Sequence, residues 1–453
     1  MRPARTTSAT NRGPKPSSDP SRIARGPADP TSLRGIDPGL LVLPVRPPYH
    51  RSVGLGTRVG VGPLISPRDV PASQPGFEVQ SVLNPAAARL GDEVVLLMRV
   101  AERARSDIDP PADARTLDLG GPHPKIVPLP SGYRKQDVVA IGMRDPNETA
   151  FGFVPLYLPR DLPGLHLADP RSVSFTHPQL GTTVRFPAQV SHLRCARSSD
   201  GVHFKVDPEP ALSASTDLEE YGCEDPRATY IDGVWHITYV SVSRVGITVS
   251  LALTTDFRRF EKLGALLPPD QKDIALFPER RHGRYMALTR PMPSSFGHVL
   301  GIWISMPEPR MPWGTHRPLV LPRESMWDER HTGAGTVPFE TPSGWLEIYH
   351  GVNAQLDYAL GAVLLDRSDP TRILGRSEEP ILTADASHER VGLMPNVVFT
   401  CGHVPLGDDG SRIRVYYGAA DSVIAAADFE VAEILESLRS AKHGFGHEQR
   451  QSS

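Results

Sequence analysis

Five segments of the 453-residue chain repeat one pattern, and this repetition constrains the fold more than any other feature. Each segment begins at a turn residue, continues as a short run of recurring apolar residues, and ends at a polar or aromatic side chain. The segments are residues 91–99, 232–239, 282–290, 343–350 and 410–417. The last four recur at intervals of about 50 to 70 residues, a spacing typical of β-propeller blades with their loops. The sequence therefore predicts an all-β, five-bladed β-propeller over residues 37–440, with an all-β sandwich as the alternative.

The composition agrees with many short strands. The 47 prolines and 39 glycines favour turns over long helices. The formal net charge of −3, without a block of one sign, gives no reason to expect nucleic acid or an anionic membrane as a partner. The three cysteines lie far apart and lack metal-site spacing, so neither a metal site nor a disulfide framework is predicted. We expect a cytoplasmic protein, because no apolar run long enough to span a membrane and no secretory signal is visible.

Four further segments interrupt or flank the repeated pattern. Residues 1–36 are rich in Pro, Ser, Arg and Gly and are predicted to be a disordered tail. Residues 103–190 are proline-rich and poorly periodic, and are interpreted as an insertion that shapes a rim over the site. Residues 429–438 show helical spacing, with Asp428 as a candidate cap. Residues 441–453 are expected to be flexible.

The segment Glu224-Asp225-Pro226-Arg227 places two carboxylates and an arginine around a proline. Proline fixes its own φ and favours an extended conformation in the preceding residue, so Asp225 is expected to be extended. Such a corner could aim Asp225 while Arg227 holds a partner. The alternative is a turn with a local ion pair.

The five repeated strands end in cationic or hydroxyl-bearing side chains, which are Arg99, Tyr239, Arg290, His350 and Tyr417. In a propeller these ends would converge at one mouth. A carboxylic acid surrounded by such groups suits an enzyme that acts on a sugar and an anion. The acid protonates a leaving oxygen, and the cations hold the anion by charge-assisted hydrogen bonds.

At this level of detail the chain resembles glycoside hydrolase family 130, the β-mannoside phosphorylases and related mannosidases, which are five-bladed propellers. The resemblance covers roughly residues 80–430. The matching stretches are Asn84-Pro85 with Arg99, residues 196–204, 224–227, 272–279, Arg290-Pro291, 333–335, 344–352, 361–366, 395–399 and 416–421. The chain departs from the family pattern at Thr289, at His331, where a lysine is usual, and over residues 305–313.

The resemblance implies a role for each matching residue. Asp225 would be the catalytic acid, whose proton reaches the glycosidic oxygen through the 3-hydroxyl of the bound mannose. Phosphate would attack the anomeric carbon from the opposite face and give α-mannose 1-phosphate. The implied phosphate-holding residues are Lys272, Arg290, His350 and Tyr358, and the implied sugar-binding residues are Asn84, Arg99 and Asp421.

Three functions remain open from the sequence. The first is inverting phosphorolysis of a β-mannoside, which needs no second carboxylate because phosphate is already an anionic nucleophile. The second is a β-mannoside hydrolase on the same fold, with Glu279 or Glu347 as the base that activates water. The third is a non-catalytic glycan-binding propeller. No metal and no cofactor are expected. A mannose-containing oligosaccharide and inorganic phosphate are the predicted partners, and association into a homo-oligomer is left open.

Overall fold

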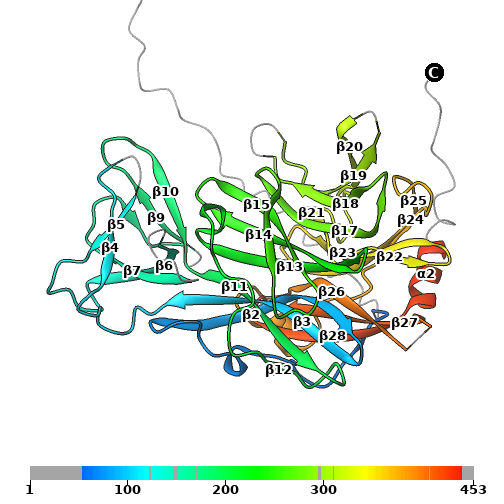
Figure 1. Cartoon of the computed structure of the whole chain (residues 1–453), viewed down its shortest axis with the longest axis horizontal. Helices are drawn as coiled ribbons and strands as arrows, with labels where there is room; N and C mark the ends of the chain where they lie inside the picture. Colours follow the sequence, from blue (N-terminus) through cyan, green and yellow to red (C-terminus); the bar gives the residue numbers. More distant parts are fainter. Residues whose placement is uncertain are drawn as a thin grey trace, which may run out of the picture. The chain divides into compact units, whose positions relative to one another are not determined.

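The computed structural model describes residues 54–121, 124–145, 152–169, 172–293, 297–309, 311–407 and 409–440. The predicted tail (1–36) and the C-terminal residues 441–453 lie outside these ranges. The described chain is built almost entirely of β-strands, so the all-β prediction is confirmed (Figure 1). Among the described residues, neither α-helix has the length and apolar character needed to cross a membrane.

Most strands fall into five antiparallel groups that follow one another along the chain. Group 1 contains β2 (Phe77–Leu90), β3 (Glu93–Ala104), β11 (Val190–Ser198) and β12 (Lys205–Val206). Group 2 contains β13 (Gly222–Ile231), β14 (Val234–Ser243), β15 (Gly246–Thr254) and β16 (Glu261–Leu267). A single parallel pair, Ser191 with Gly222, joins these two groups into one eight-stranded sheet.

The other three groups are separate sheets. Group 3 contains β17 (Gln271–Arg281), β18 (Arg284–Pro291), β19 (Ile302–Glu308) and β20 (Met311–Val320). Group 4 contains β21 (His331–Ala334), β22 (Phe339–Thr341), β23 (Gly344–Val352), β24 (Tyr358–Leu365) and β25 (Ile373–Arg376). Group 5 contains β26 (Val398–Leu406), β27 (Arg412–Ala419), β28 (Val423–Glu430) and, at its edge, β1 (Thr57–Arg58) from the start of the described chain.

The apolar core lies between neighbouring groups. Separate clusters of buried aliphatic and aromatic side chains pack group 1 on group 2, group 2 on group 3, group 3 on group 4, and group 4 on group 5. A fifth cluster packs group 5 back on group 1, with Val404 and Tyr416 against Val82 and Leu96. β23 contributes side chains to the cluster with group 3 and to the cluster with group 5. Both of its faces are therefore covered, which explains why it is apolar over most of its length and buried throughout.

A second structural feature recurs in three groups. A tyrosine at the sixth residue of β14, β23 and β27 donates to a buried carboxylate: Tyr239 to Glu219, Tyr349 to Asp328, and Tyr417 to Glu389, at 2.7–2.8 Å. An outer-strand cation completes each cluster, and these cations are Lys262, Arg376 and Arg58. The prediction that Tyr239 and Tyr417 join the ring around the catalytic acid is therefore wrong, because their hydroxyls bind carboxylates of their own groups.

Residues between β3 and β11 form two small additional sheets. One sheet contains β4 (Arg115–Asp118), β5 (Lys125–Pro128), β6 (Val138–Arg144) and β7 (Phe153–Pro159), and the other contains β8 (Leu165–His166), β9 (Ser172–Thr176) and β10 (Thr183–Pro187). The end of β6 contacts the loop before β13: Arg144 donates its backbone N–H to the Glu220 carbonyl at 3.0 Å and pairs with Asp217 at 2.9 Å.

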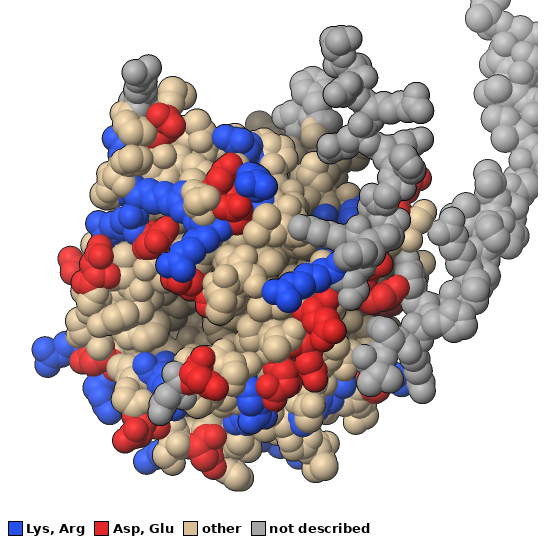
Figure 2. All heavy atoms as spheres, turned by 90° about the vertical axis from the view of Figure 1, so that its right-hand side faces the viewer, with Lys and Arg blue, Asp and Glu red and all other residues tan. Residues whose placement is uncertain are grey.

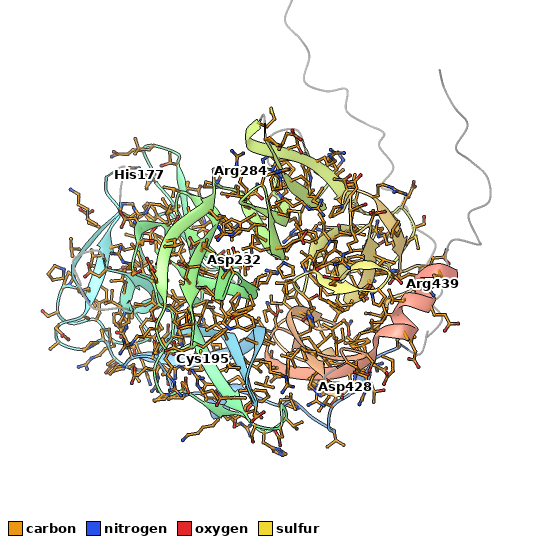
Figure 3. The ribbon with its side chains drawn as sticks, turned by 45° about the vertical axis from the view of Figure 1, so that its right-hand side comes forward. His177, Cys195, Asp232, Arg284, Asp428 and Arg439 are labelled. Atoms are coloured by element: carbon orange, nitrogen blue, oxygen red, sulfur yellow. The ribbon has the colours of Figure 1, made fainter. Side chains whose placement is uncertain are left out.

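Short helical turns complete the fold, namely η1 (Pro67–Asp69), η2 (Asp217–Glu219) and α1 (Ser387–Arg390). The C-terminal helix α2 spans Val431–Ser440, so it begins two residues later than predicted. Phe429 belongs to β28, and Asp428 is not its cap but an ion-pair partner of Arg414 (2.7 Å). Figure 3 shows Asp428 on β28 and Arg439 towards the end of α2. The surface turned to the viewer in Figure 2 carries Lys and Arg intermixed with Asp and Glu.

Candidate active site

The first strands of groups 1, 2 and 3 carry the same local distortion, and each points a polar side chain to one place. The pairing register shifts between Leu83 and Ala86 in β2, between Glu224 and Arg227 in β13, and between Lys272 and Ala275 in β17. The residues inside these bulges, Asn84, Asp225 and Asp273, have φ values of 49°, 45° and 52°. Asn and Asp tolerate this left-handed region better than most residues, and bulges commonly re-aim a side chain.

The conformation of Asp225 corrects the sequence-based expectation. Proline at 226 was expected to keep Asp225 extended, but its φ of 45° lies in the left-handed region. The bulge decides the conformation, because two residues of β13 must be accommodated outside the regular ladder with β14. The segment still acts as a corner that aims Asp225, as predicted, but by a different backbone geometry.

Asp225 is buried and is held through one oxygen. Its Oδ1 accepts hydrogen bonds from Asn84 Nδ2 (2.8 Å) and from Arg99 Nη1 (3.3 Å). Its Oδ2 makes no hydrogen bond to any residue that the structure describes. A carboxyl group fixed at one oxygen and open at the other can present a proton in a defined direction.

Arg99 connects Asp225 to a second carboxylate. Its Nη2 donates to Glu224 Oε1 at 2.8 Å and its Nε donates to Ser191 Oγ at 3.0 Å. Lys272 Nζ lies 3.9 Å from Glu224 Oε2. Burial disfavours the charged guanidinium, yet Glu224, Asp225 and Asp421 together raise the pKa of Arg99. Arg99 therefore stays cationic beside the catalytic-acid candidate.

A second cluster forms around Asp273, whose side chain is 1% exposed. Its Oδ2 lies 2.6 Å from Arg290 Nε and 3.7 Å from His350 Nε2, and its Oδ1 lies 3.3 Å from Arg227 Nη2. Burial alone would raise the pKa of Asp273, but Arg290, Arg227 and His350 hold it well below its usual range. The carboxylate is therefore ionised and compensated by its neighbours.

Arg227 joins the two clusters. Its side chain is 1% exposed, and it donates to the carbonyl oxygens of Asp225 (3.3 Å), Ala334 (2.5 Å) and Gly335 (2.9 Å) as well as pairing with Asp273. The prediction that Arg227 holds a partner is borne out by these contacts, which are to backbone and to Asp273. Lys272 and Arg290 are direct cross-strand partners in β17 and β18, so both cations lie beside this junction.

Aromatic rings form one wall of the site. The ring of His350 lies 6.0 Å from Tyr358, 6.2 Å from His331 and 4.4 Å from Phe399, measured between centroids. Burial lowers the pKa of His350 well below its usual value and that of His331 to about 4, so both rings are neutral at pH 7. His350 can thus donate a hydrogen bond to an anion from one nitrogen without carrying charge.

Gly333 in β21 allows this wall to approach Asp273. A Cβ at this position would lie 2.4 Å from Asp273 Oδ2 and 2.4 Å from His350 Cε1. Glycine is needed here because of close packing, since no L side chain fits in that space. The structure therefore brings together all the predicted site residues: Asp225, Lys272, Arg290, His350, Tyr358, Asn84, Arg99 and Asp421.

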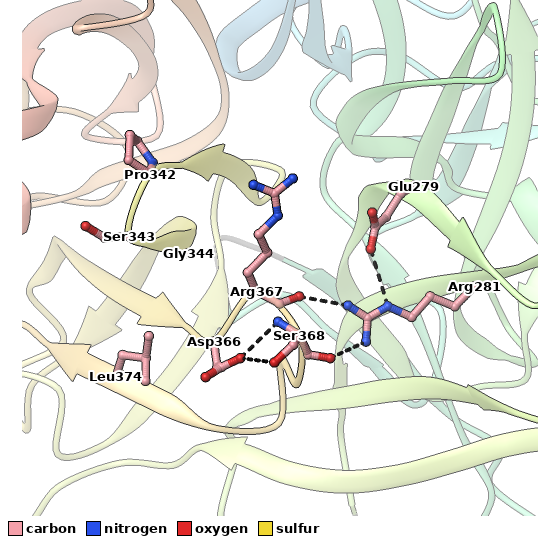
Figure 4. A pocket seen from close by; sticks show the side chains of 9 residues that line it. All are labelled: Glu279, Arg281, Pro342, Ser343, Gly344, Asp366, Arg367, Ser368 and Leu374. Atoms are coloured by element: carbon pink, nitrogen blue, oxygen red, sulfur yellow. Dashed lines mark hydrogen bonds and ion pairs between the residues drawn. The ribbon is translucent and has the colours of Figure 1, made fainter.

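The two glutamates considered as hydrolytic bases lie elsewhere. Glu279 is six residues beyond Asp273 on β17, roughly 20 Å away at about 3.3 Å per residue. It pairs with Arg281 at 3.3 Å and lines a different pocket, next to Arg367 and Ser368, whose carbonyls accept from Arg281 (Figure 4). Glu347 is fully buried, accepts from Gly335 N–H at 2.9 Å, and has its pKa raised well above the usual value by burial. A carboxyl group enclosed in this way has no open face for an attacking water.

Asp273 is the site residue that sequence reasoning missed. It lies in the matching stretch 272–279, for which the resemblance implies a role only at Lys272. A usable signal is present in the sequence, because Asn84-Pro85, Asp225-Pro226 and Asp273-Ile274 each lie on the strand that precedes a repeated segment. In the described ranges, no three side chains of His, Cys, Asp or Glu are arranged to hold a metal ion.

The raised pKa of Asp421 predicts that the free energy of unfolding depends on pH. Burial raises its pKa from 3.8 to about 6, with Asp225 and Glu224 adding to the effect and Arg99 opposing it. The folded state then holds this proton more tightly than the unfolded state, so its contribution to stability is full below about pH 4 and is lost as pH rises through 6. At 1.36 kcal/mol per pK unit the loss is on the order of 3 kcal/mol.

Replacing Asp421 by Asn should remove that loss. We expect the free energy of unfolding of wild type minus that of D421N to fall between pH 4 and pH 7, measured by urea denaturation at each pH. Taking the difference cancels the titration of other carboxylates. A difference that stays constant, or that grows with pH, would contradict the raised pKa of Asp421 and its cause, desolvation.

The comparisons with known proteins agree with this geometry. The family model described as β-1,4-mannooligosaccharide phosphorylase, Glyco_hydro_130, matches residues 186–440. A β-1,2-mannobiose phosphorylase of Listeria innocua is 34% identical over 376 residues, which are 83% of this chain and 96% of that protein. A 1,2-β-oligomannan phosphorylase of Thermoanaerobacter is 35% identical over 258 residues, 56% of this chain and 84% of that protein.

A solved structure is also similar to the described fold. The β-1,2-mannobiose phosphorylase of Listeria innocua, in complex with β-1,2-mannobiose, superposes with a TM-score of 0.70 at 33% identity. The match covers 85% of this chain and 99% of that one. The match begins well before residue 186, so the similarity is not confined to the part of the chain that the family model recognises.

Proposed function

We propose that this chain, which belongs to glycoside hydrolase family 130, catalyses the phosphorolysis of a β-mannoside. The observation that carries the proposal is the arrangement around Asp225. Its carboxyl group is hydrogen-bonded through one oxygen only, and cationic and hydrogen-bond-donating side chains lie beside it. Neither glutamate considered as a hydrolytic base is placed to activate water, since Glu279 is remote and Glu347 is fully buried and accepts from Gly335 N–H. Phosphate does not need such a base.

The proposed reaction assigns the sugar to the Asp225 side of the site. Asn84, Arg99 and Asp421 hold the mannosyl unit. The Oδ1 atom of Asn84 is buried and accepts no hydrogen bond from the described residues, so a sugar hydroxyl can fill that role. Asp225 supplies its proton, through the mannose 3-hydroxyl, to the glycosidic oxygen as the bond from that oxygen to the anomeric carbon breaks.

Phosphate enters from the opposite side. Lys272, Arg290, His350 and Tyr358 hold it, and one of its oxygens forms the new bond to the anomeric carbon with inversion. The products are α-mannose 1-phosphate and the shortened sugar. Two cations and two neutral donors offset the charge of the anion without removing its nucleophilicity. Inorganic phosphate is thus a co-substrate, and no metal or other cofactor takes part in the proposed scheme.

We infer that the architecture is a five-bladed propeller in which groups 1 to 5 are the blades. The apolar clusters between successive groups, together with the cluster that packs group 5 on group 1, support a closed ring. The tyrosine–carboxylate–cation clusters of groups 2, 4 and 5 support a repeated unit. The sheets between β3 and β11 would then form the proposed rim beside blade 1. A homo-oligomeric state and a cytoplasmic location stay predictions.

The substrate linkage is proposed to be β-1,2. The β-1,2-mannobiose phosphorylase of Listeria innocua is matched over 96% of its length at 34% identity, whereas the β-1,4-mannooligosaccharide phosphorylase of Ruminococcus albus is matched over 76% at 30%. Incubation with phosphate and either β-1,2- or β-1,4-mannobiose tests this, with mannose 1-phosphate as the readout. We expect at least a tenfold preference for the 1,2-linked disaccharide. Equal or reversed rates would overturn the linkage.

A further inference from the structure

We propose that Asp273 is a positioning residue for phosphate: it orients Arg290 and His350 so that Arg290 presents its Nη groups and His350 its Nε2–H to the anion. The proposal rests on the proposed phosphorolysis. Nothing in the family resemblance gives Asp273 a role, although two of the four phosphate-holding candidates contact it. Its carboxylate is itself negative and would repel phosphate, so its part must be indirect.

The first line of evidence for this role is the geometry of Arg290. Arg290 Nε forms an ion pair with Asp273 Oδ2 at 2.6 Å, although the two atoms do not have hydrogen-bond geometry. Its two Nη groups make no hydrogen bond or ion pair to any described residue, and the side chain is 10% exposed. A guanidinium anchored through Nε keeps its Nη edge for bidentate binding of a planar pair of oxygens. The anchoring carboxylate therefore sets the direction in which that edge points.

The second line of evidence is the environment of His350. Its ring is fully buried, and neither ring nitrogen has a hydrogen-bond partner among the described residues. The nearest polar atom given for Nε2 is Asp273 Oδ2 at 3.7 Å. A carboxylate in this position favours the proton of the neutral imidazole on Nε2, and 3.7 Å is too long for a hydrogen bond, so this N–H stays available to an oxygen of the anion. A buried, unpaired N–H beside cations is what an incoming anion would satisfy.

Asp328, next to group 4, is a control that distinguishes a role in positioning phosphate from a role in stabilising the fold. Asp328 is as buried as Asp273 and likewise holds two arginines, Arg323 at 2.8 Å and Arg376 at 2.5 Å. Its third partner is the Tyr349 hydroxyl, within the structural cluster of that group. Loss of Asp273 leaves two buried arginines, and loss of Asp328 two partly exposed arginines, without their counter-charge, so both losses should destabilise the fold. Only Asp273 contacts residues assigned to phosphate.

The experiment compares D273N and D328N with wild type. Initial rates are measured with β-1,2-mannobiose while phosphate is varied, and then with phosphate saturating while the disaccharide is varied. We expect D273N to raise the KM for phosphate at least tenfold and to change the KM for mannobiose less than threefold. D328N should lower the melting temperature and leave both KM values within twofold of wild type.

A second variant keeps the test decisive if D273N fails to fold. Gly333→Ala retains the carboxylate but places a methyl group 2.4 Å from both Asp273 Oδ2 and His350 Cε1, so the carboxylate and the ring must change their relative positions. We expect the same selective rise in the phosphate KM. An unchanged phosphate KM in a folded D273N or G333A enzyme, or equal rises in both KM values, would overturn the positioning role alone. A wild-type enzyme whose rate is independent of phosphate would instead refute the proposed function.

Discussion

Replacing Asp225 by Asn should reduce kcat/KM for β-mannobiose phosphorolysis by about 10³- to 10⁴-fold, the upper range for loss of a general acid. Asn has the same shape and can still accept from Asn84 and Arg99 through its amide oxygen, so the fold should persist. It has no acidic proton to give to the leaving oxygen. The measurement is the initial rate of mannose 1-phosphate formation at saturating phosphate.

Two control measurements show whether the loss in D225N is due to the missing acid. A mannosyl substrate with a highly acidic leaving group needs little protonation, so its phosphorolysis should be reduced far less in D225N than that of mannobiose. Glu279→Gln, an isosteric change of a carboxylate on β17 that lies roughly 20 Å from the site, should leave both rates within twofold. Equal losses on both substrates would mean that Asp225 acts in binding and not as an acid.

The second large effect is expected at Arg290. We predict that Arg290→Ala raises the KM for phosphate by about 10²-fold, because a charge-assisted bidentate contact in a buried site contributes on the order of 3 kcal/mol. The change also leaves Asp273 facing only Arg227 and His350. The measurement is the phosphate dependence of the initial rate at saturating disaccharide.

Arg323→Ala is the matched control for Arg290→Ala. Arg323 also pairs with a buried carboxylate, Asp328, and with the Ser377 carbonyl, but it contacts no residue assigned to substrate. It should reduce stability and leave the phosphate KM unchanged. A phosphate KM that rises equally in both variants would show that general loosening of the fold, and not loss of an anion contact, explains the Arg290 result.

The sequence predicted the site better than it predicted the local geometry. Repeated strands and their polar ends, together with the family resemblance, led to Arg99, Arg290 and His350, which lie on three different sheets and meet around Asp225 and Asp273. The same reasoning failed for Tyr239 and Tyr417. From one sequence, a tyrosine that ends in a site and one that binds a buried carboxylate of its own group look alike.

Two other errors have a similar cause. The left-handed φ of Asp225 results from a bulge, which depends on the pairing of β13 with β14 and not on the Asp-Pro dipeptide alone. Asp273 was overlooked because its three partners, Arg227, Arg290 and His350, come from β13, β18 and β23. Such convergence is a product of tertiary packing. Comparison of the three bulged strands with one another would have pointed to it.

The most direct test of the account is the consumption of β-1,2-mannobiose with and without inorganic phosphate, followed by NMR of the products. We predict that turnover requires phosphate and that the first product is mannose 1-phosphate in the α configuration. Release of free mannose at the same rate when phosphate is omitted would show that water is the nucleophile and would contradict the roles given to Lys272, Arg290 and His350.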